Sequence, residues 1–121
     1  MNKVYHLSSC DTCRRILQET NAAQSCILQD IKTNQITPEQ LDELAEKAGS
    51  YEALFSRKAL KFRAMGLHEK SLTEQDYRSL ILSEYTFLKR PVFIIGEEIF
   101  IGNTQKIVQA AKEVLKTHPQ S

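Results

Sequence analysis

Apolar and polar positions along the first part of the chain predict a strand, a helix and a second strand. Residues 4–7 form a short apolar run that ends at two serines, which is typical of a buried strand. Residues 11–20 place Cys13 and Ile16 on one helical face, and residues 25–29 are the second strand candidate. A βαβ unit of this length predicts parallel strands joined by a right-handed crossover.

Helical patterns fill the middle of the chain, from about residue 37 to residue 84. Thr37 and Gln40 have the spacing of a capping box around Pro38, which is a favourable first residue of a helix. Apolar residues then recur with helical spacing until Gly49, a typical C-terminal stop. This pattern predicts a helix that starts at Pro38 and ends just before Gly49.

A second capping box predicts where another helix of this block begins. Thr73 and Asp76 have the required spacing, and Leu72 can pack against Tyr77 across the start of the helix. Between the two capped helices, residues 50–61 predict one or two short helices.

After the helical block the pattern changes to that of strands. The apolar runs 92–95 and 99–101 flank Gly96, which predicts an antiparallel hairpin with a positive φ in its turn. A last amphipathic helix is predicted to start at Asn103 or Thr104.

The order of these elements predicts an α/β fold, in which a small mixed sheet carries flanking helices. We expect a single domain over residues 1–121 with a helical insertion at about residues 37–84 between its βαβ and ββα halves. The tail at residues 118–121 is expected to fray.

Composition and charge exclude several classes of partner. The chain has 16 lysines and arginines against 15 aspartates and glutamates, so we expect no direct binding to nucleic acid and none to a membrane. No apolar run approaches the roughly 20 residues that span a bilayer, and the polar N-terminus lacks the pattern of a secretory signal. We therefore expect a cytoplasmic protein, in which three cysteines indicate chemistry or burial rather than a structural disulfide.

Cys10 and Cys13 form a Cys-x-x-Cys motif at the predicted strand-to-helix junction. There, the helix dipole and free backbone N–H groups can stabilise a thiolate, the nucleophilic and redox-active form of cysteine. Cys10 is the candidate nucleophile, and Arg14 or Arg15 adds positive charge one turn later. The alternatives are a buried cysteine pair or half of a zinc site. No second motif of this kind and no His-x₃-His completes four zinc ligands, so we predict no bound metal.

The other cysteines and the histidines have less specific interpretations. Cys13 is either a resolving thiol that forms a disulfide with Cys10 or an apolar filler on the buried helical face, and the redox role is favoured. Cys26 lies among apolar residues of the second predicted strand and is interpreted as a core cysteine. His6 is interpreted as a core or rim histidine with satisfied hydrogen bonds, and His68 as a solvent-exposed residue.

Arg57 and Arg90 are candidate anion-binding residues because each lies near an apolar segment and its guanidinium fork suits a tetrahedral oxyanion. The alternative for either arginine is an ordinary surface charge. Pro91 directly precedes a strongly apolar strand, where a proline can adopt the cis peptide bond.

Three segments of the chain resemble the arsenate reductase (ArsC) and Spx family. They are the strand-to-helix turn at residues 5–14, the segment at residues 49–58, and the arginine-proline-strand segment at residues 89–94. The resemblance covers nearly the whole chain in the right order. It implies a thioredoxin-like fold with a helical insertion.

The resemblance also implies roles for individual residues. Cys10 matches the catalytic cysteine, which attacks arsenate to form a thiol–arsenate adduct, and Arg14 matches the arginine that follows it by four. Arg57 matches an oxyanion-binding arginine, and Arg90 precedes the family's cis proline, here Pro91. The implied substrate is a small oxyanion or thiol. No bound cofactor is implied, and the reductant is glutathione or a glutaredoxin or thioredoxin.

The chain departs from the arsenate reductases just after the last predicted strand. Those enzymes have a third arginine there, whereas this chain has Asn103 at the corresponding substrate-binding position. Loss of one charged hydrogen bond costs about 1.5–3 kcal/mol, which lowers the expected affinity for arsenate roughly tenfold to a hundredfold. The second cysteine of the turn, Cys13, is instead the Spx pattern.

Two functions from different classes follow from the resemblance. In the enzyme interpretation, which we favour, Cys10 attacks arsenate, a related oxyanion or an oxidised thiol, and Cys13 or glutathione completes turnover. In the regulatory interpretation, an Spx-like redox switch binds the α subunit of RNA polymerase, and a Cys10–Cys13 disulfide sets its state. Gly49 falls where that interaction needs a small residue, although it is also an ordinary helix stop.

Overall fold

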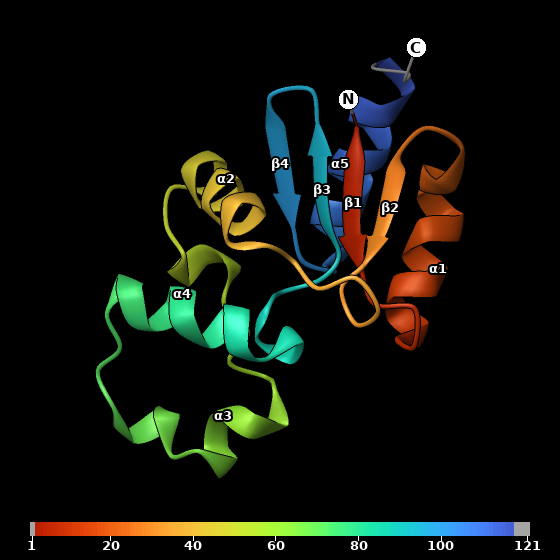
Figure 1. Ribbon diagram of the computed structural model, residues 1–121. Helices are drawn as coiled ribbons and strands as arrows, with labels where there is room; N and C mark the ends of the chain where they lie inside the picture. The colour runs from red at the N-terminus through yellow and green to blue at the C-terminus, as the bar shows by residue number, and fades with distance from the viewer. Residues whose placement is uncertain (1, 118–121) are drawn as a thin grey trace. The chain divides into compact units, whose positions relative to one another are not determined.

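The computed structural model describes residues 2–117, so the predicted frayed tail lies outside the described residues (Figure 1). The chain forms two compact units. One, the sheet unit, consists of the residues up to 35 and from 90 onward, and the other, the helical unit, consists of residues 36–89.

Within the described residues, the sheet unit has four strands in the order β2-β1-β3-β4. Their bounds are Lys3–His6 for β1, Ile27–Asp30 for β2, Val92–Ile95 for β3 and Glu98–Ile101 for β4. β1 is parallel to β2 and antiparallel to β3, and β3 is antiparallel to β4. The predicted parallel βαβ unit, the hairpin and the mixed sheet are therefore confirmed.

The second strand begins two residues later than its sequence pattern predicts. A short 3₁₀ turn, η1 at Ala22–Gln24, follows α1, and the N–H groups of Ser25 and Cys26 both donate to the carbonyl of Ala22. Because these two amides close the turn, the pairing with β1 starts only at Ile27, opposite Lys3. Cys26 thus lies just before β2 rather than within it, although it is buried as expected.

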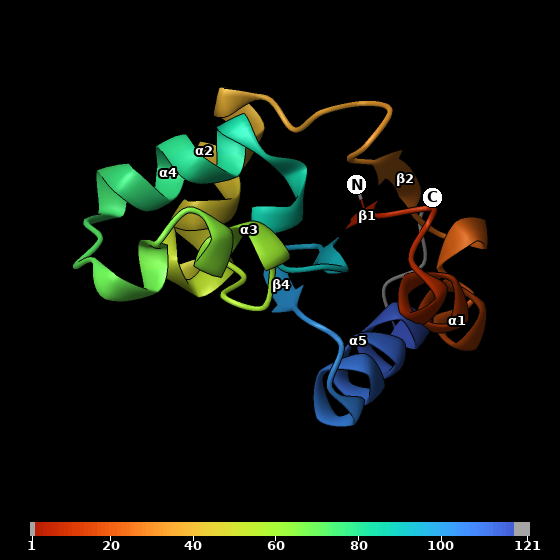
Figure 2. The same cartoon turned by 90° about the horizontal axis from the view of Figure 1, so that it is seen from below.

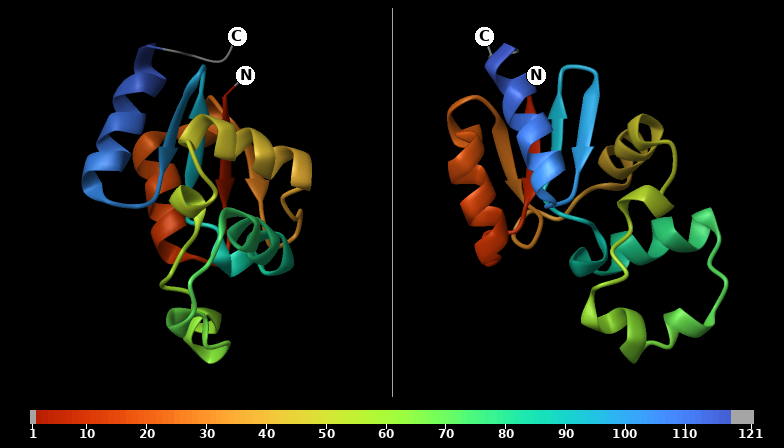
Figure 3. Two further views of the ribbon diagram at one scale, coloured as in Figure 1. Left: turned by 90° about the vertical axis from the view of Figure 1, so that its left-hand side faces the viewer. Right: turned by 180° about the vertical axis from the view of Figure 1, so that it is seen from behind.

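Two helices of the sheet unit, α1 at Asp11–Thr20 and α5 at Gln105–Thr117, pack side by side on one face of the sheet (Figures 2 and 3). Side chains from α1, α5 and the two central strands form one apolar cluster between them. Its buried members are Val4, Ile16, Ala22, Cys26, Phe93, Ile95, Val108, Ala111 and Leu115. Burial of this surface is the main force that holds the start of α1 against the sheet.

The helical unit contains α2 at Pro38–Ala48, α3 at Leu60–Ala64 and α4 at Glu74–Ser83, with 3₁₀ turns η2 at Glu52–Leu54, η3 at Leu67–Glu69 and η4 at Tyr85–Phe87. Both predicted capping boxes are present, at the starts of α2 and α4. Gly49 ends α2 with φ +96°, in the left-handed region that glycine adopts without a steric penalty. The two capped helices are thus where local sequence predicts them.

Aromatic rings form the centre of the helical unit. Phe55 is fully buried, and its ring centroid lies 4.9 Å from that of Tyr77, 5.1 Å from that of Phe87 and 5.9 Å from that of Phe62. Edge and offset contacts at these separations add to the stabilisation from burial. Tyr77 is therefore fixed by its ring, which positions its hydroxyl group.

Among residues 2–117, no helix is long and apolar enough to cross a membrane.

Candidate functional site

Cys10 lies at the junction that the sequence predicts, as the N-cap residue of α1. It is partly exposed, whereas Cys13, on the first turn, is 1% exposed. The backbone before α1 turns tightly, because the N–H of Cys10 donates to the carbonyl of Leu7 at 3.0 Å. The N–H of Arg14 donates in turn to the Cys10 carbonyl at 3.1 Å, which starts the helix.

Asp30, at the end of β2, holds the loop that carries the nucleophile. One carboxylate oxygen accepts from the Ser8 hydroxyl at 2.5 Å, and the other accepts from the Ser8 N–H at 3.3 Å. Arg14 supports the same loop from the helix side, since it donates to the Ser8 carbonyl at 3.0 Å and pairs with Asp11. We call this arrangement of Ser8, Asp30 and Arg14 the loop clamp.

The surroundings of Cys10 favour its thiolate. Partial burial raises the pKa of the Cys10 thiol, but the backbone N–H groups of Cys13 and Thr12, the Cys13 side chain and the positive charge of Arg90 lower it. The net effect is a pKa below the ordinary cysteine value. The thiol makes no capping hydrogen bond of normal geometry, so these amides act on the sulfur chiefly when it is charged.

Cys13 has the opposite electrostatic surroundings. Burial raises the pKa of its thiol to about 11, and the nearby negative charge of Cys10 adds to that shift. At neutral pH, Cys13 is therefore a protonated thiol, and the interaction between the two side chains lowers the pKa of Cys10 and raises that of Cys13. The two cysteines are in contact, as the Cys-x-x-Cys spacing predicts, but only one of them is activated.

Arg90 and Pro91 contribute the other side of this site. The peptide bond between them is cis, as predicted, and Pro91 is buried at the start of β3. Arg90 is half-buried and lies close enough to lower the pKa of both Cys10 and Cys13. The positive charge of Arg90 therefore acts on the activated sulfur.

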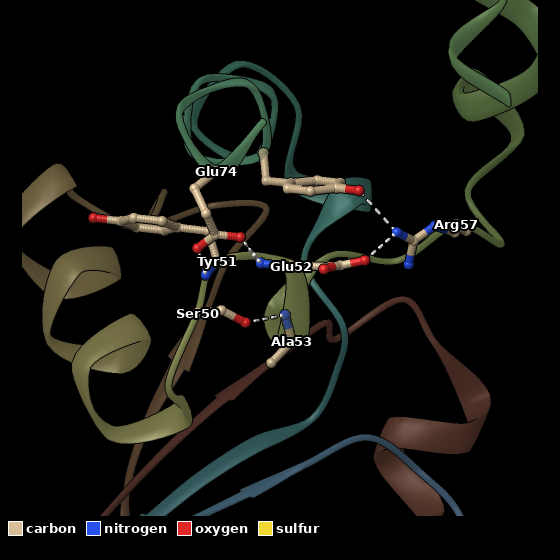
Figure 4. A network of polar contacts seen from close by, with 7 residues as sticks. Ser50, Tyr51, Glu52, Ala53, Arg57 and Glu74 are labelled. Carbon is tan, nitrogen blue, oxygen red and sulfur yellow. Dashed lines mark hydrogen bonds and ion pairs between the residues drawn. The ribbon is translucent and has the colours of Figure 1, made fainter. Parts of the chain in front are cut away.

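The remaining predicted site residues lie in two other places. Asn103 is exposed in the segment between β4 and α5, so it occupies the predicted position after the last strand. Arg57 belongs to the helical unit, where its guanidinium donates to a Glu52 carboxylate oxygen at 2.7 Å and to the Tyr77 hydroxyl at 2.8 Å (Figure 4). The oxyanion-binding role of Arg57 stays a prediction.

Glu74 orders the backbone at Glu52, the residue whose carboxylate binds Arg57. Its carboxylate accepts from the backbone N–H of Tyr51 at 2.7 Å and from that of Glu52 at 3.1 Å, at the start of η2 (Figure 4). The hydroxyl of Ser50 accepts from Ala53 at 3.1 Å and caps the same turn. Two side-chain acceptors thus fix the backbone from which Glu52 reaches Arg57.

His6 differs from its sequence interpretation. It is 8% exposed, as a core histidine should be, but among the described residues its Nδ1 atom has no hydrogen-bond partner. Burial lowers the pKa of its imidazole, and the nearby charge of Asp30 opposes that shift. The predicted satisfaction of its hydrogen bonds is wrong because the strand register sets His6 beside Asp30 without giving Nδ1 an acceptor or donor.

Sequence reasoning missed Ser8 and Asp30 as parts of the site. A usable signal was present, since β1 and β2 were expected to be parallel and the carboxyl ends of parallel strands meet at one edge of a sheet. An aspartate at the end of the second strand and a serine after the first could therefore be expected to lie close together at that edge.

Three comparisons bear on the identity of this fold. The profile of the ArsC family matches residues 5–111, which is most of the chain. Among curated proteins, none matches the chain significantly by sequence.

Several solved structures are similar to this one. An arsenate reductase from Vibrio cholerae has a TM-score of 0.76 at 15% identity, with 94% of this chain and 97% of that chain covered. A possible arsenate reductase from Streptococcus mutans has a TM-score of 0.70 at 26% identity, with 87% and 92% covered. An ArsC-related protein from Brucella melitensis has a TM-score of 0.70 at 21% identity, with 90% and 92% covered. The expected thioredoxin-like fold is confirmed.

Proposed function

The chain belongs to the ArsC family, and from that premise we propose that it is a thiol-dependent reductase whose nucleophile is Cys10. The observation that supports this most directly is the contrast between the two cysteines. The pKa of Cys10 is lowered at the start of α1, beside Arg90, whereas that of Cys13 is raised. An activated thiolate beside a fixed cation suits attack on an anionic centre.

With arsenate as substrate, the Cys10 thiolate attacks arsenic, and a hydroxide leaves as water after it takes a proton. The product is a thiol–arsenate adduct with one new sulfur–arsenic bond. A second thiol then attacks the Cys10 sulfur, and the electron pair of the sulfur–arsenic bond passes to arsenic. Arsenate becomes arsenite, two thiols become one disulfide, and one water is released.

The second thiol is Cys13 or an external glutathione. The interaction between its side chain and that of Cys10 supports Cys13 in this role, but Cys13 must lose its proton before it can attack. Once Cys10 has formed an adduct, the negative charge lies on the arsenate oxygens and no longer on the Cys10 sulfur, and where Arg90 offsets that charge, deprotonation of Cys13 would become easier. If Cys13 is the resolving thiol, glutaredoxin or thioredoxin then reduces the Cys10–Cys13 disulfide.

The cations have separate proposed roles. Arg90 would hold the oxyanion and the charged adduct, while Arg14 mainly keeps the loop clamp in place through its bond to the Ser8 carbonyl. Asn103 would supply a neutral donor where the arsenate reductases have a third arginine. This replacement would weaken the binding of arsenate more than that of a less charged substrate. Arg57 is proposed as a further oxyanion-binding residue from the family resemblance alone.

The decisive experiment is arsenate turnover by the purified protein in two parallel assays. One contains glutathione and glutaredoxin, and the other contains a thioredoxin system. Cys10→Ser should abolish turnover in whichever assay is active, and Cys26→Ala, which removes a thiol from the core, is the matched control. Turnover retained by Cys10→Ser would contradict the proposal.

The contact between Cys10 and Cys13 also favours one alternative function, an Spx-like redox switch that binds the α subunit of RNA polymerase. Its proposed contact surface includes Gly49, which is exposed and has open space around its Cα. If both turnover assays are silent while Cys10 still alkylates rapidly, this alternative takes precedence. Oxidised and reduced protein would then be compared for binding to the purified C-terminal domain of the polymerase α chain.

A further inference from the structure

The helical unit contains a pocket whose lining residues, Arg57 excepted, have no role in the proposed cysteine chemistry. Its volume is about 460 Å³, which lies within the range of small-molecule sites. The residues that line it come from the segment 57–77 alone. The pocket is therefore formed by α3, η3, the start of α4 and the chain between them.

One part of the pocket is apolar. Phe62 and Leu67 are buried, Leu72 is half-buried, and Tyr77, 7% exposed, contributes to the lining as well. The contacts of Tyr77 and Phe62 with Phe55 fix both rings from behind. This part can therefore accept an apolar group without rearrangement.

The polar part of the lining is entirely basic or neutral. It consists of Arg57, His68, Lys70 and Ser71, and no acidic side chain of the described residues lines the pocket. That bias is local, since the whole chain has nearly equal numbers of acidic and basic residues. Glu52, which pairs with Arg57, and Glu69, 3.7 Å from His68, lie outside the lining.

Hydrogen-bond directions favour an acceptor as the ligand. Arg57 donates to the Tyr77 oxygen at 2.8 Å, so the proton of that hydroxyl is directed away from Arg57 and can be donated elsewhere. The Arg57 guanidinium keeps further N–H groups beyond the two that bind Glu52 and Tyr77. Lys70 and Ser71, both exposed at the rim, offer additional donors.

We propose that this pocket binds a small organic anion. Its carboxylate, sulfonate or phosphate group would be held by Arg57, Lys70 and the Tyr77 hydroxyl, and its apolar part would pack against Phe62 and Leu72. A bare inorganic anion would leave the apolar walls unused, and a neutral apolar compound would leave the donors unpaired. The inference needs no reaction at Cys10, although it gives Arg57 a ligand other than the oxyanion that the family resemblance implies for it.

The test uses the full chain and the fluorescent anion 8-anilinonaphthalene-1-sulfonate, which combines aromatic rings with one sulfonate. Lys70→Gln should weaken saturable binding about three- to tenfold, and Lys70→Glu should weaken it further, because an exposed charge contact is partly screened. Lys58→Gln is the matched control, since Lys58 is exposed next to Arg57 but does not line the pocket. The uncharged analogue N-phenyl-1-naphthylamine should bind weakly and equally to all four proteins.

Two further readouts keep the outcome unambiguous. Equal urea midpoints show that the Lys70 variants are folded, and amide NMR shifts on titration should concentrate in residues 57–77. The proposal is overturned if Lys70→Glu binds the probe as tightly as Lys58→Gln, if the neutral analogue binds as well as the anion, or if the shifts lie elsewhere. Cys10→Ser should leave probe binding unchanged while it abolishes turnover, so the two proposals can fail separately.

Discussion

The sheet unit and the helical unit each hold a charged group, but they do so by different means. At the start of α1, the Cys10 thiolate is stabilised by backbone amides and by one half-buried cation. In the helical unit, the Arg57 guanidinium is held by side chains, namely those of Glu52 and Tyr77. Backbone donors are fixed by the helix itself, whereas side-chain pairs at an exposed position lose conformational entropy and are screened by water.

The two groups therefore differ in how much of their stabilisation a single side-chain substitution can remove. Removing any one side chain near Cys10 leaves the amides of Thr12 and Cys13 in place. Removing Glu52 deletes half of what orients Arg57.

The largest effect is expected between the two cysteines themselves. At pH 7, Cys10 should react with iodoacetamide more than about a hundredfold faster than Cys13, because the rate follows the thiolate fraction. Mass spectrometry of partially alkylated protein measures both rates, and the pH profile of the Cys10 rate should have its midpoint below about 8.5. Similar rates for the two thiols would remove the distinction on which the sheet unit's role depends.

The next effect concerns the cation beside the sulfur. Arg90→Gln should raise the pKa of Cys10 and weaken competitive binding of an inert oxyanion such as sulfate roughly tenfold to a hundredfold, the worth of one charged hydrogen bond. Alkylation rates in the presence of sulfate measure both quantities. Arg63→Gln is the control, since Arg63 is an exposed arginine of the helical unit. An unchanged sulfate affinity in Arg90→Gln would assign this residue a structural role only.

A smaller effect is expected from His6 on the pH dependence of stability. Burial lowers the pKa of His6 in the folded protein. At a pH just below the ordinary histidine pKa of about 6.5, the unfolded chain therefore binds more protons than the folded protein. The free energy of unfolding should therefore fall as the pH drops below about 6.5. His6→Gln should flatten this part of the profile, as urea midpoints at pH 5 and pH 7.5 would show. An unaltered profile in the variant would mean that protonated His6 is tolerated in the fold.

The smallest effect is expected in the helical unit. Glu52→Gln breaks an exposed ion pair, so it should lower the free energy of unfolding by only about 0.2–1 kcal/mol. A double-mutant cycle with Arg57→Gln, followed by urea unfolding at low and high salt, isolates that pair. A coupling energy well above this range would show that side-chain pairing holds Arg57 as firmly as the backbone holds Cys10.

Local patterns made much of the fold predictable. The start of α1, the two capping boxes at Thr37 and Thr73, and the positive φ of Gly96 all depend on residues within a few positions of one another. The start of β2 was placed too early because apolar residues alone do not reveal that a 3₁₀ turn uses the amides of Ser25 and Cys26. A buried apolar residue gives the same sequence pattern whether it lies in a turn or in a strand.

The site was only partly predictable for the same reason. Cys10, Cys13 and the cis bond before Pro91 could be identified from adjacent residues. The bond between Ser8 and Asp30 spans 22 positions, and that between Arg57 and Tyr77 spans 20, so each requires the folded arrangement. Sequence shows which residues can carry charge, and tertiary packing decides which charges meet.

The loop clamp makes the reactivity of the Cys10 thiol depend on folding. Ser8 meets Asp30 only after β1 and β2 have paired, and α1 packs on the sheet through Ile16 in the same cluster. In a nascent or denatured chain, Cys10 lacks both the ordered amides and Arg90, so its thiol has ordinary reactivity. The alkylation rate of this thiol is thus expected to rise as the sheet forms, so it would follow the folding of the chain.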